Sequence, residues 1–282
     1  MNYQNLFKAI YELTGIHLQE DKIYLLESRL PDLMKKYSLS SFDELASKVQ
    51  NRDNPDLLKE FINSITTQET YFFRDQIIYE ALIQKIIPDW INRNGGEESI
   101  RAKNLKLKIW SAGCATGQEP YSIAITIKEN FPRLIDLIDI QATDISIVAV
   151  EKARRGNYLG IEVDRGVEDR IKEKYFNMTG YGYEIVSDIR NLVRFSLLNL
   201  HIDAYPREMD IIFCRNVAIY FHKEDRKKIY TRLRNSLRVD GVLALGSAES
   251  LYGFIDDFII QEYKICRYYQ FKKTETSRET FF

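Results

Sequence analysis

The sequence has few residues of the kinds that characterise secreted, membrane-spanning or metal-binding proteins. It contains only three cysteines, and their spacing matches no metal-ligand pattern, so we expect no metal site. Two of them, Cys114 and Cys214, lie in apolar strand-like runs, which predicts buried thiols in a reducing compartment. No apolar run approaches membrane-spanning length, and the first residues, MNYQNLFKAI, lack a signal-peptide layout. These absences predict a cytoplasmic protein without membrane insertion.

An excess of one charge is also missing. Lys and Arg number 40 against 41 Asp and Glu, so the formal net charge is −1. A nearly neutral chain gives no general electrostatic reason to bind nucleic acid or a membrane surface, and we expect neither partner. Hydrophobic residues make up 45% of the 282 residues, which is typical of a globular protein with a large core.

Hydrophobic periodicity divides the chain into two parts. Residues 1–90 have apolar side chains at intervals of three and four, which predicts a small all-α domain. Within it, Pro31 predicts a break and Ser41 a capped helix start. In residues 105–273, strand-like runs alternate with helical ones, which predicts a parallel sheet with helices on both faces. We expect the polar, glycine-bearing residues 91–104 to form the linker between the two domains.

The α/β part has a clear order of elements. The expected strands are 107–111, 138–143, 192–197, 210–214 and 242–246. The expected helices are 122–130, 146–155, 167–175 and 223–237. Two final apolar runs, 258–262 and 266–271, predict an antiparallel hairpin at the end of the sheet. A glycine-flanked run predicts a small β-subdomain near 176–190, and the polar tail 274–282 is expected to be flexible.

Residues 109–121, IWSAGCATGQEPY, run from an apolar segment through two glycines into a helix. A strand, a small-residue turn and a helix form a ligand-binding junction at the carboxyl edge of a parallel sheet. The glycines, Gly113 and Gly117, let a ligand lie against bare backbone. The run matches neither G-x-x-x-x-G-K-[ST] nor G-x-G-x-x-G, and Glu119 would repel a pyrophosphate. It suits a ligand with hydroxyls and a positive charge, which points to S-adenosylmethionine; a turn that needs glycine only for packing is the alternative.

An acidic residue ends the second expected strand. Asp144 follows the glycine turn by a few tens of residues, at the position where a carboxylate accepts hydrogen bonds from ribose hydroxyls. We prefer Asp144 over Asp136 and Asp139 for this role. The alternative is that Asp144 only caps the helix that starts at Ser146.

Polar residues interrupt the helical region at 66–75, TTQETYFFRD. Threonine hydroxyls compete for backbone hydrogen bonds and favour a turn, which Phe72 and Phe73 would anchor. The alternative is a simple N-cap for a helix over 76–92.

Two residue pairs complete the predicted crevice. Arg215 and Asn216 directly follow the strand 210–214, and Asn199 and Leu200 follow the strand before it. Since the carboxyl ends of parallel strands meet at one edge, these pairs, the glycine turn and Asp144 converge there.

Four stretches in this order, TTQETYFFR, GCATGQEPYSIAI, ATDIS and FCRNVAIYF, resemble the signatures of the chemotaxis-receptor methyltransferases, the CheR family. The resemblance covers nearly the whole chain. It implies a helical domain joined to a Rossmann-like methyltransferase domain that carries a β-subdomain. It also implies methyl transfer from S-adenosylmethionine to glutamates on the cytoplasmic domains of chemoreceptors, with glutamyl methyl esters and S-adenosylhomocysteine as products.

The resemblance also indicates which residues form the site. Gln68 stands where the family usually has Asn. Independently of the resemblance, their position near the predicted crevice makes Arg74, a cation, and Tyr220, through its hydroxyl, the candidates to hold the incoming carboxylate. The predicted cofactor-binding residues are Gln68, Thr70, Arg74, Gly113, Glu119, Asp144, Asn199, Leu200, Arg215 and Asn216.

Members that tether to a receptor pentapeptide usually carry a longer, glycine-rich loop in the β-subdomain. The corresponding stretch 176–189 is short, so we expect a monomeric enzyme that docks without pentapeptide tethering. Two other interpretations stay open. One is a non-catalytic module that binds S-adenosylmethionine or S-adenosylhomocysteine, and the other is a methyltransferase acting on a small molecule or a different protein. A nicotinamide dehydrogenase is disfavoured because its glycine fingerprint is absent.

Overall fold

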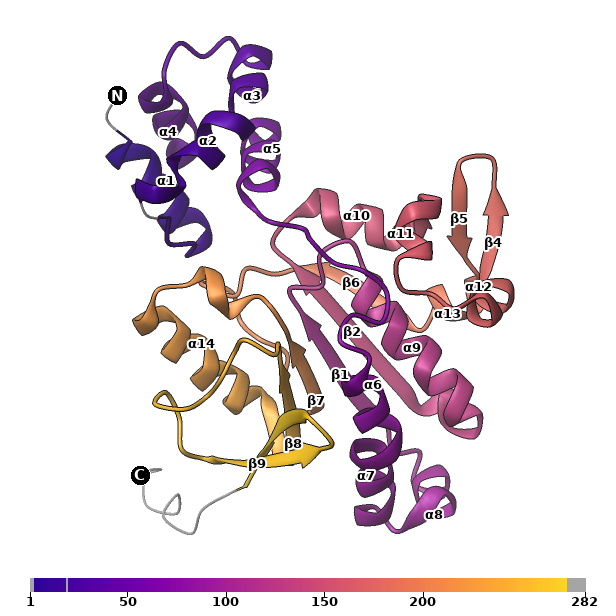
Figure 1. Cartoon of the computed structure of the whole chain (residues 1–282). Helices are drawn as coiled ribbons and strands as arrows, with labels where there is room; N and C mark the ends of the chain where they lie inside the picture. The colour runs from indigo at the N-terminus through magenta and orange to yellow at the C-terminus, as the bar shows by residue number, and fades with distance from the viewer. Residues whose placement is uncertain (1–2, 19, 273–282) are drawn as a thin grey trace.

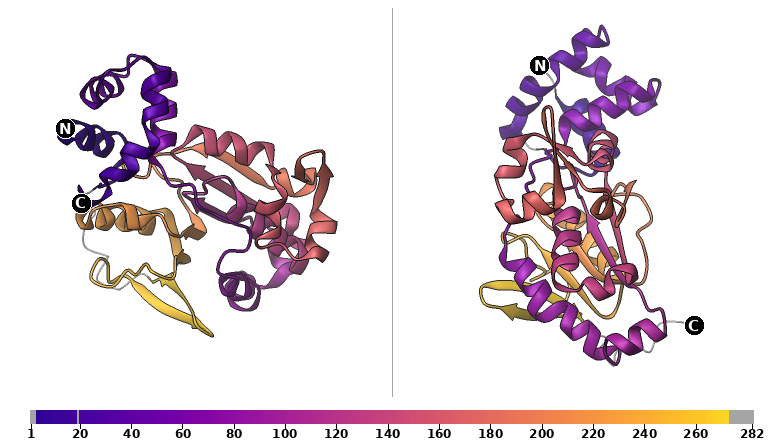
Figure 2. Two further views of the ribbon diagram at one scale, coloured as in Figure 1. Left: turned by 45° about the horizontal axis from the view of Figure 1, so that its top comes forward. Right: turned by 90° about the vertical axis from the view of Figure 1, so that its right-hand side faces the viewer.

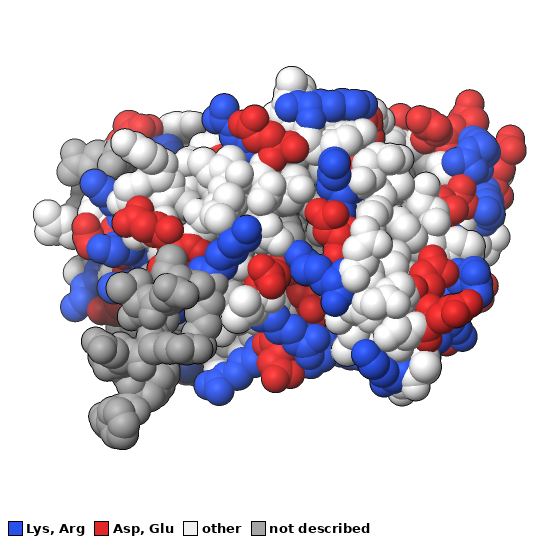
Figure 3. Space-filling view, turned by 90° about the horizontal axis from the view of Figure 1, so that it is seen from below, with Lys and Arg blue, Asp and Glu red and all other residues white. Residues whose placement is uncertain are grey.

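A computed structural model describes residues 3–18 and 20–272, and it shows a helical cluster attached to a larger α/β body (Figures 1 and 2). No helix in these ranges is long and apolar enough to cross a membrane. Basic and acidic side chains alternate over the face drawn in Figure 3, in keeping with the nearly zero net charge. The predicted flexible tail, 274–282, lies outside the described residues.

The N-terminal helices enclose a core of their own. They are α1 (Gln4–Thr14), the short η1 (Glu20–Lys22), α2 (Ile23–Arg29), α3 (Pro31–Lys36), α4 (Phe42–Asn51) and α5 (Pro55–Ile65). Leu6, Leu45 and Phe61 are fully buried where the apolar faces meet. The predicted break at Pro31 is confirmed, because proline has no N–H to continue α2 and instead begins α3.

Helix α4 begins at the predicted cap. The Ser41 hydroxyl accepts a hydrogen bond of 3.1 Å from the backbone N–H of Glu44. Ser41→Ala is expected to lower the free energy of unfolding by about 1 kcal/mol, measured by urea denaturation, because this N–H loses its partner. Ser28→Ala is the matched control, since the Ser28 hydroxyl only donates to the Leu25 carbonyl on an exposed helix. Equal effects of the two substitutions would show that the cap contributes nothing.

Seven strands form the main sheet. They are β1 (Leu107–Ala112), β2 (Ile138–Asp144), β6 (Val193–Leu197), β7 (Met209–Cys214), β8 (Leu237–Leu245), β9 (Phe258–Tyr263) and β10 (Cys266–Phe271). Their order is β6-β2-β1-β7-β8-β10-β9, parallel from β6 to β8 and antiparallel through the final hairpin. The predicted strands and hairpin are confirmed, although β8 begins earlier than 242 because Leu237 pairs with Met209 across a bulge.

Helices cover both faces of this sheet. One face packs against α6 (Ile77–Ala81), the π-helical η2 (Leu82–Ile86), α7 (Ile87–Arg93), α9 (Gln118–Asn130) and α10 (Ile147–Arg155). The other packs against α14 (Lys223–Ser236). Successive residues of β1 alternate between the faces, so Ile109 belongs to the first core and Trp110 to the second. Residues 132–137 form η3 (Pro132–Leu137) before β2.

The change from the N-terminal core to the sheet core falls at residue 66 rather than within the expected linker 91–104. Part of that linker is α8 (Gly96–Ala102), and Trp90 and Ile100 are buried in the same core as the sheet. The N-terminal core ends with Ile65. Periodicity identifies the apolar face of a helix but not the core against which the face packs, so the sequence alone does not tell which core the helices after residue 75 join.

A second, three-stranded sheet is inserted between β2 and β6. Its order is β3 (Asn157–Tyr158), β5 (Gly182–Ile185) and β4 (Phe176–Thr179), accompanied by α11 (Gly160–Asp164), α12 (Asp169–Tyr175) and α13 (Ser187–Arg190). The predicted β excursion near 176–190 is thus confirmed, and its third strand comes from earlier in the chain. A Cβ on Gly182 would lie 2.1 Å from the Tyr158 carbonyl oxygen, so the pairing of β3 with β5 needs a glycine.

Candidate functional site

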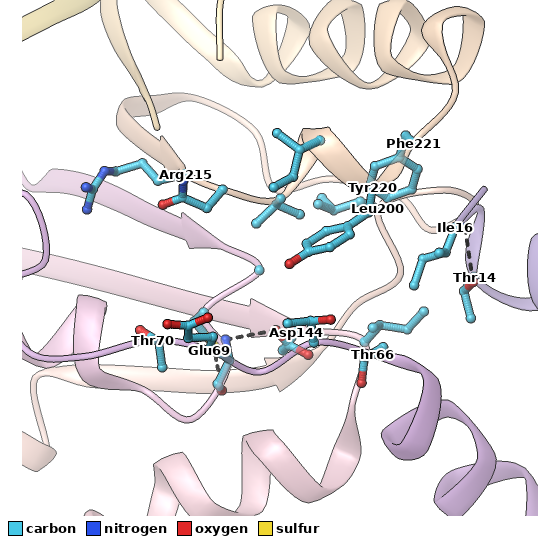
Figure 4. A pocket seen from close by; sticks show the side chains of 18 of the residues that line it. Thr14, Ile16, Thr66, Glu69, Thr70, Asp144, Leu200, Arg215, Tyr220 and Phe221 are labelled. Atoms are coloured by element: carbon cyan, nitrogen blue, oxygen red, sulfur yellow. Dashed lines mark hydrogen bonds between the residues drawn. The ribbon is translucent and has the colours of Figure 1, made fainter. Parts of the chain in front are cut away.

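A cavity of about 300 Å³ opens at the carboxyl edge of the main sheet (Figure 4). The turns that follow β1, β2, β6 and β7 line it, together with residues of the segment 66–74 and the end of α1. The edge predicted from the sequence therefore does hold the cavity, and its volume is at the lower end for a small-molecule site.

The glycine turn after β1 forms the floor of the cavity. Gly113 and Gly117 have φ angles of 74° and 96°, in the left-handed region that glycine adopts most readily. The backbone N–H groups of Gly113 and Cys114 both donate to the Thr143 carbonyl, which ties the turn to β2. A Cβ on Gly113 would lie 2.5 Å from Val217. Packing against Val217 alone therefore requires glycine at position 113, in agreement with the alternative of a turn that needs glycine for packing. Gly113 also lines the cavity.

Glu119, in the first turn of α9, is at the centre of a buried polar network. Its carboxylate accepts from the Ser111 hydroxyl at 2.7 Å and from the Arg215 guanidinium at 3.2 Å. Arg215, whose side chain is 3% exposed, also pairs with Asp75 and donates to the Arg74 carbonyl. Burial raises the pKa of Glu119, and the nearby positive charge of Arg215 partly opposes that rise. The network fastens the segment before α6 to the sheet edge.

Asp144 braces two backbone turns at the end of β2. One carboxylate oxygen accepts from the Ala115 N–H at 2.8 Å and the other from the Ser146 N–H at 2.9 Å. The helix cap itself is Ser146, whose hydroxyl accepts from the Ala149 N–H. A carboxylate has about four acceptor positions, so Asp144 keeps capacity toward the cavity that it lines. Burial raises the pKa of Asp144.

Residues 66–75 form the predicted turn rather than a helix cap. Phe72 is fully buried and packs edge-on against Tyr158 and Phe176, at ring-centroid distances of 5.0 and 5.2 Å. Helix α6 begins only at Ile77 and has no side-chain cap. Thr70 and Arg74 both line the cavity, and the Arg74 guanidinium donates to the Glu69 carbonyl at 3.1 Å.

Gln68 differs from its prediction. Its amide nitrogen donates to the Asn63 side chain at 2.6 Å and to the Ser146 hydroxyl at 3.1 Å, and the residue is not part of the cavity lining. The side chain thus joins α5 to α10. Its neighbours Thr67 and Glu69 do line the cavity.

The facing wall carries the remaining predicted residues. Asn199, Leu200, Asn216 and Tyr220 all line the cavity, and Figure 4 shows the Tyr220 hydroxyl pointing into the space opposite Asp144. The Asn199 side chain is already engaged, since its amide donates to the Leu13 carbonyl at 2.8 Å and accepts from the His201 N–H at 2.9 Å.

The end of α1 also contributes to the wall, which the sequence analysis did not predict. Thr14 and Ile16 line the cavity, Ile16 forms a β-bridge with Phe221, and the His17 N–H donates to the Tyr220 carbonyl at 3.0 Å. These are backbone contacts at the end of an ordinary amphipathic helix, so no motif marks them. The N-terminal helices therefore form part of the site.

The lining fits a nucleoside with a positive charge. Three acidic residues, Glu69, Glu119 and Asp144, line the cavity, and Leu198 and Leu200 add apolar surface. Arg215 already pairs with Glu119 and Asp75, so it has no unpaired charge to offer to a phosphate. The carboxylates can accept hydrogen bonds from the hydroxyls and the ammonium group of S-adenosylmethionine, and the leucines can contact its base.

Comparison with known proteins agrees with this geometry. The family described as CheR methyltransferase, all-alpha domain, matches residues 1–66, and CheR methyltransferase, SAM binding domain, matches residues 68–266. The chain is similar to chemotaxis protein methyltransferase Cher2 of Pseudomonas putida, at 36% identity over 92% of this chain and 93% of that protein. It is also similar to chemotaxis protein methyltransferase 1 of Pseudomonas aeruginosa, at 36% identity over 90% and 92%.

A third relative, the chemotaxis protein methyltransferase of Vibrio parahaemolyticus, is 37% identical over 91% of each chain. The predicted resemblance, the fold class and the S-adenosylmethionine cofactor are thereby confirmed. The break between the two matched regions also coincides with the change of core at residue 66. The chain belongs to the CheR methyltransferase family.

Proposed function

We propose that this protein methylates glutamate side chains on the cytoplasmic domains of chemoreceptors and forms glutamyl methyl esters. The observation that carries the proposal is a cavity lined by Glu119, Asp144, Arg74 and Tyr220, in which Figure 4 shows Tyr220 opposite Asp144. The chemotaxis methyltransferases to which the chain is similar support the choice of receptors as the substrate.

The carboxylates are assigned to the cofactor. Asp144 accepts hydrogen bonds from the ribose hydroxyls, while Glu119 holds the ammonium group and Leu200 contacts the base. When bound, S-adenosylmethionine supplies an electrophilic methyl group on a sulfonium. Thr70, Gly113, Asn199, Arg215 and Asn216 complete the binding surface, Asn199 and Arg215 by fixing its walls rather than through free side-chain groups.

The acceptor needs orientation rather than deprotonation. A glutamate carboxylate is already ionised near neutral pH, so the reaction requires no general base. The cavity lining within the described residues includes no histidine, which agrees with this chemistry. Arg74 and Tyr220 hold the carboxylate in line with the methyl group. The Arg74 guanidinium donates to the Glu69 carbonyl, and its remaining N–H groups are available to the acceptor carboxylate.

Affinity for the cofactor product is expected to fall as the pH decreases, and the fall is expected to begin at a higher pH than exposed carboxylates would give. Glu119 and Asp144 bind the ligand as carboxylates, and the pKa of each is raised by burial. They therefore begin to take up protons at a higher pH than exposed carboxylates do. Titration calorimetry with S-adenosylhomocysteine measures the effect. The Glu119→Gln variant is expected to bind less tightly and with a weaker pH dependence, and an equal slope would contradict the assignment.

Receptor docking is proposed to occur without pentapeptide tethering, by a monomer. The support is the connection between β4 and β5, which consists only of Gly180 and Tyr181. Gel filtration coupled to light scattering tests the oligomeric state. Equal methylation rates on receptor fragments with and without an added C-terminal pentapeptide test the docking mode.

Incubation with methyl-labelled S-adenosylmethionine and a panel of receptor cytoplasmic fragments tests the function as a whole. The label is expected on receptor as a methyl ester, which mild base releases as methanol. A base-stable label, or label on another substrate only, would establish a different methyltransferase. Binding of S-adenosylhomocysteine without any transfer would establish a non-catalytic binding module.

A further inference from the structure

A carboxylate outside the cavity holds the backbone of the segment that carries Tyr220. Residues 246–249 make a tight turn after β8, closed by a hydrogen bond of 2.9 Å from the Glu249 N–H to the Gly246 carbonyl. The turn brings the Glu249 side chain back toward the sheet edge. There its Oε2 accepts from the N–H groups of Asn216 at 2.7 Å and Gly246 at 2.8 Å, and its Oε1 accepts from the Ala218 N–H at 2.9 Å.

These bonds fix a segment with little regular structure. Asn216 has a φ angle of 59°, in the left-handed region, and η4 (Ala218–Tyr220) is a single short turn. Both Asn216 and Tyr220 line the cavity. At the far end of η4, the Tyr220 carbonyl accepts from the His17 N–H at 3.0 Å. Hydrogen bonds to Glu249 thus fix the start of the segment 216–220, and the hydrogen bond from His17, just after α1, fixes its end.

The approach of the two loops leaves no room for a side chain between them. A Cβ on Gly246 would lie 2.7 Å from the Asn216 amide nitrogen and 2.8 Å from Oε2 of Glu249. The glycine is required here for space, since its φ is ordinary. Gly246 therefore leaves the space in which the two loops approach each other, and Glu249 accepts the hydrogen bonds that hold them together.

We propose that Glu249 is a positioning residue for methyl transfer, acting through the 216–220 segment on Tyr220. Glu249 is not among the residues that line the cavity, so it is not assigned contact with either substrate. A carboxylate suits the task because both of its oxygens only accept, whereas a glutamine would turn an NH₂ group toward one set of backbone N–H groups. The inference rests on the proposed function, in which Tyr220 orients the acceptor carboxylate.

The kinetic test compares Glu249→Gln, Tyr220→Phe and the double variant. Glu249→Gln is expected to lower kcat about 10- to 100-fold, because a small displacement of an orienting group has a large effect on rate. Affinity for S-adenosylhomocysteine is expected to fall less than kcat. If Glu249 acts through Tyr220, the double variant loses no more than about twofold beyond the worse single variant. Glu262→Gln is the matched control, because Glu262 forms an exposed ion pair with Arg267 on the distant hairpin.

Additive losses in kcat would overturn the proposal, because a general loss of stability does not depend on Tyr220. A kcat of Glu249→Gln within twofold of the unchanged protein would overturn it as well. A second measurement needs no acceptor: the amide NMR signals of Asn216, Ala218 and Gly246 are expected to shift in Glu249→Gln and not in Glu262→Gln. Unshifted signals would refute the positioning role. Shifted signals with no receptor methylation by the unchanged protein would refute the proposed function alone.

Discussion

Replacing Asp144 with alanine is expected to weaken binding of S-adenosylhomocysteine about 100- to 10,000-fold. Two hydrogen bonds from ribose hydroxyls to one carboxylate would be lost, and each bond to a charged group contributes about 1.5–3 kcal/mol. The substitution also leaves the Ala115 and Ser146 N–H groups without their acceptor, so the glycine turn loses a brace. Both effects act in the same direction. Titration calorimetry measures the dissociation constant.

A second substitution disturbs the turn less than alanine does. Asp144→Asn keeps nearly the same volume and one acceptor oxygen, so one of the two backbone N–H groups, of Ala115 and Ser146, keeps its acceptor while the other faces an NH₂ group. One of the two ribose contacts is also lost, so the loss of affinity is expected to be smaller than that of Asp144→Ala. Asp136→Asn is the matched control, because Asp136 forms an exposed pair with Arg101 away from the cavity. An affinity of Asp144→Asn equal to that of Asp136→Asn would remove Asp144 from the ribose site.

The sequence predicted the sheet edge well because strand ends are local features. An apolar run followed by a polar residue identifies the tip of a buried strand, and in a parallel sheet all such tips meet at one edge. Asp144, Arg215 and Asn216 could therefore be placed together without knowing their contacts. The structure confirms the edge and the cavity. It also adds what those side chains bind, notably the pairing of Arg215 with Asp75 as well as with Glu119.

The parts that escaped prediction depend on contacts between distant residues. Glu249 lies about thirty residues after the segment it holds, and nothing in its immediate sequence indicates three backbone partners. Asn199 was expected at the cofactor, but its amide joins the sheet edge to Leu13 in the first helix. The match to a family motif placed Gln68 in the predicted site, although its side chain donates hydrogen bonds to Asn63 in α5 and to Ser146 at the start of α10. Spacing along the chain cannot specify such partners.

The two cores meet at the cavity, so the segment that joins them also contributes residues to the site. Residues 66–75 connect the cores. They also supply Arg74 and Asp75, which pairs with Arg215. A segment that links two bodies has few backbone bonds of its own. Its shape here comes from the burial of Phe72 and from Arg215, which binds both the Arg74 carbonyl and the neighbouring Asp75. The link between the bodies is therefore also one wall of the site.

Replacing Arg74 with alanine is expected to lower kcat about 100- to 1,000-fold. This is the range seen when a preorganised donor to a reacting group is removed. The substitution removes the bond from the Arg74 side chain to the Glu69 carbonyl but leaves the Arg74 backbone carbonyl, which accepts from Arg215, so the path of the segment is expected to survive. Affinity for S-adenosylhomocysteine is expected to fall by about tenfold or less, since Asp144 and Glu119 remain. Initial rates of ester formation on receptor fragments measure the effect.

Two companion variants identify which property of Arg74 matters. Arg74→Lys keeps the positive charge but loses the planar guanidinium that donates to the Glu69 carbonyl, so it is expected to recover only part of the lost rate. Arg267→Ala, at an exposed arginine on the hairpin, is the control and is expected to leave kcat unchanged. If Arg74→Ala matched that control in kcat, the acceptor carboxylate would be oriented by Tyr220 without Arg74. If Arg74→Lys restored the full rate, charge alone would suffice and the fixed guanidinium geometry would have no role in catalysis.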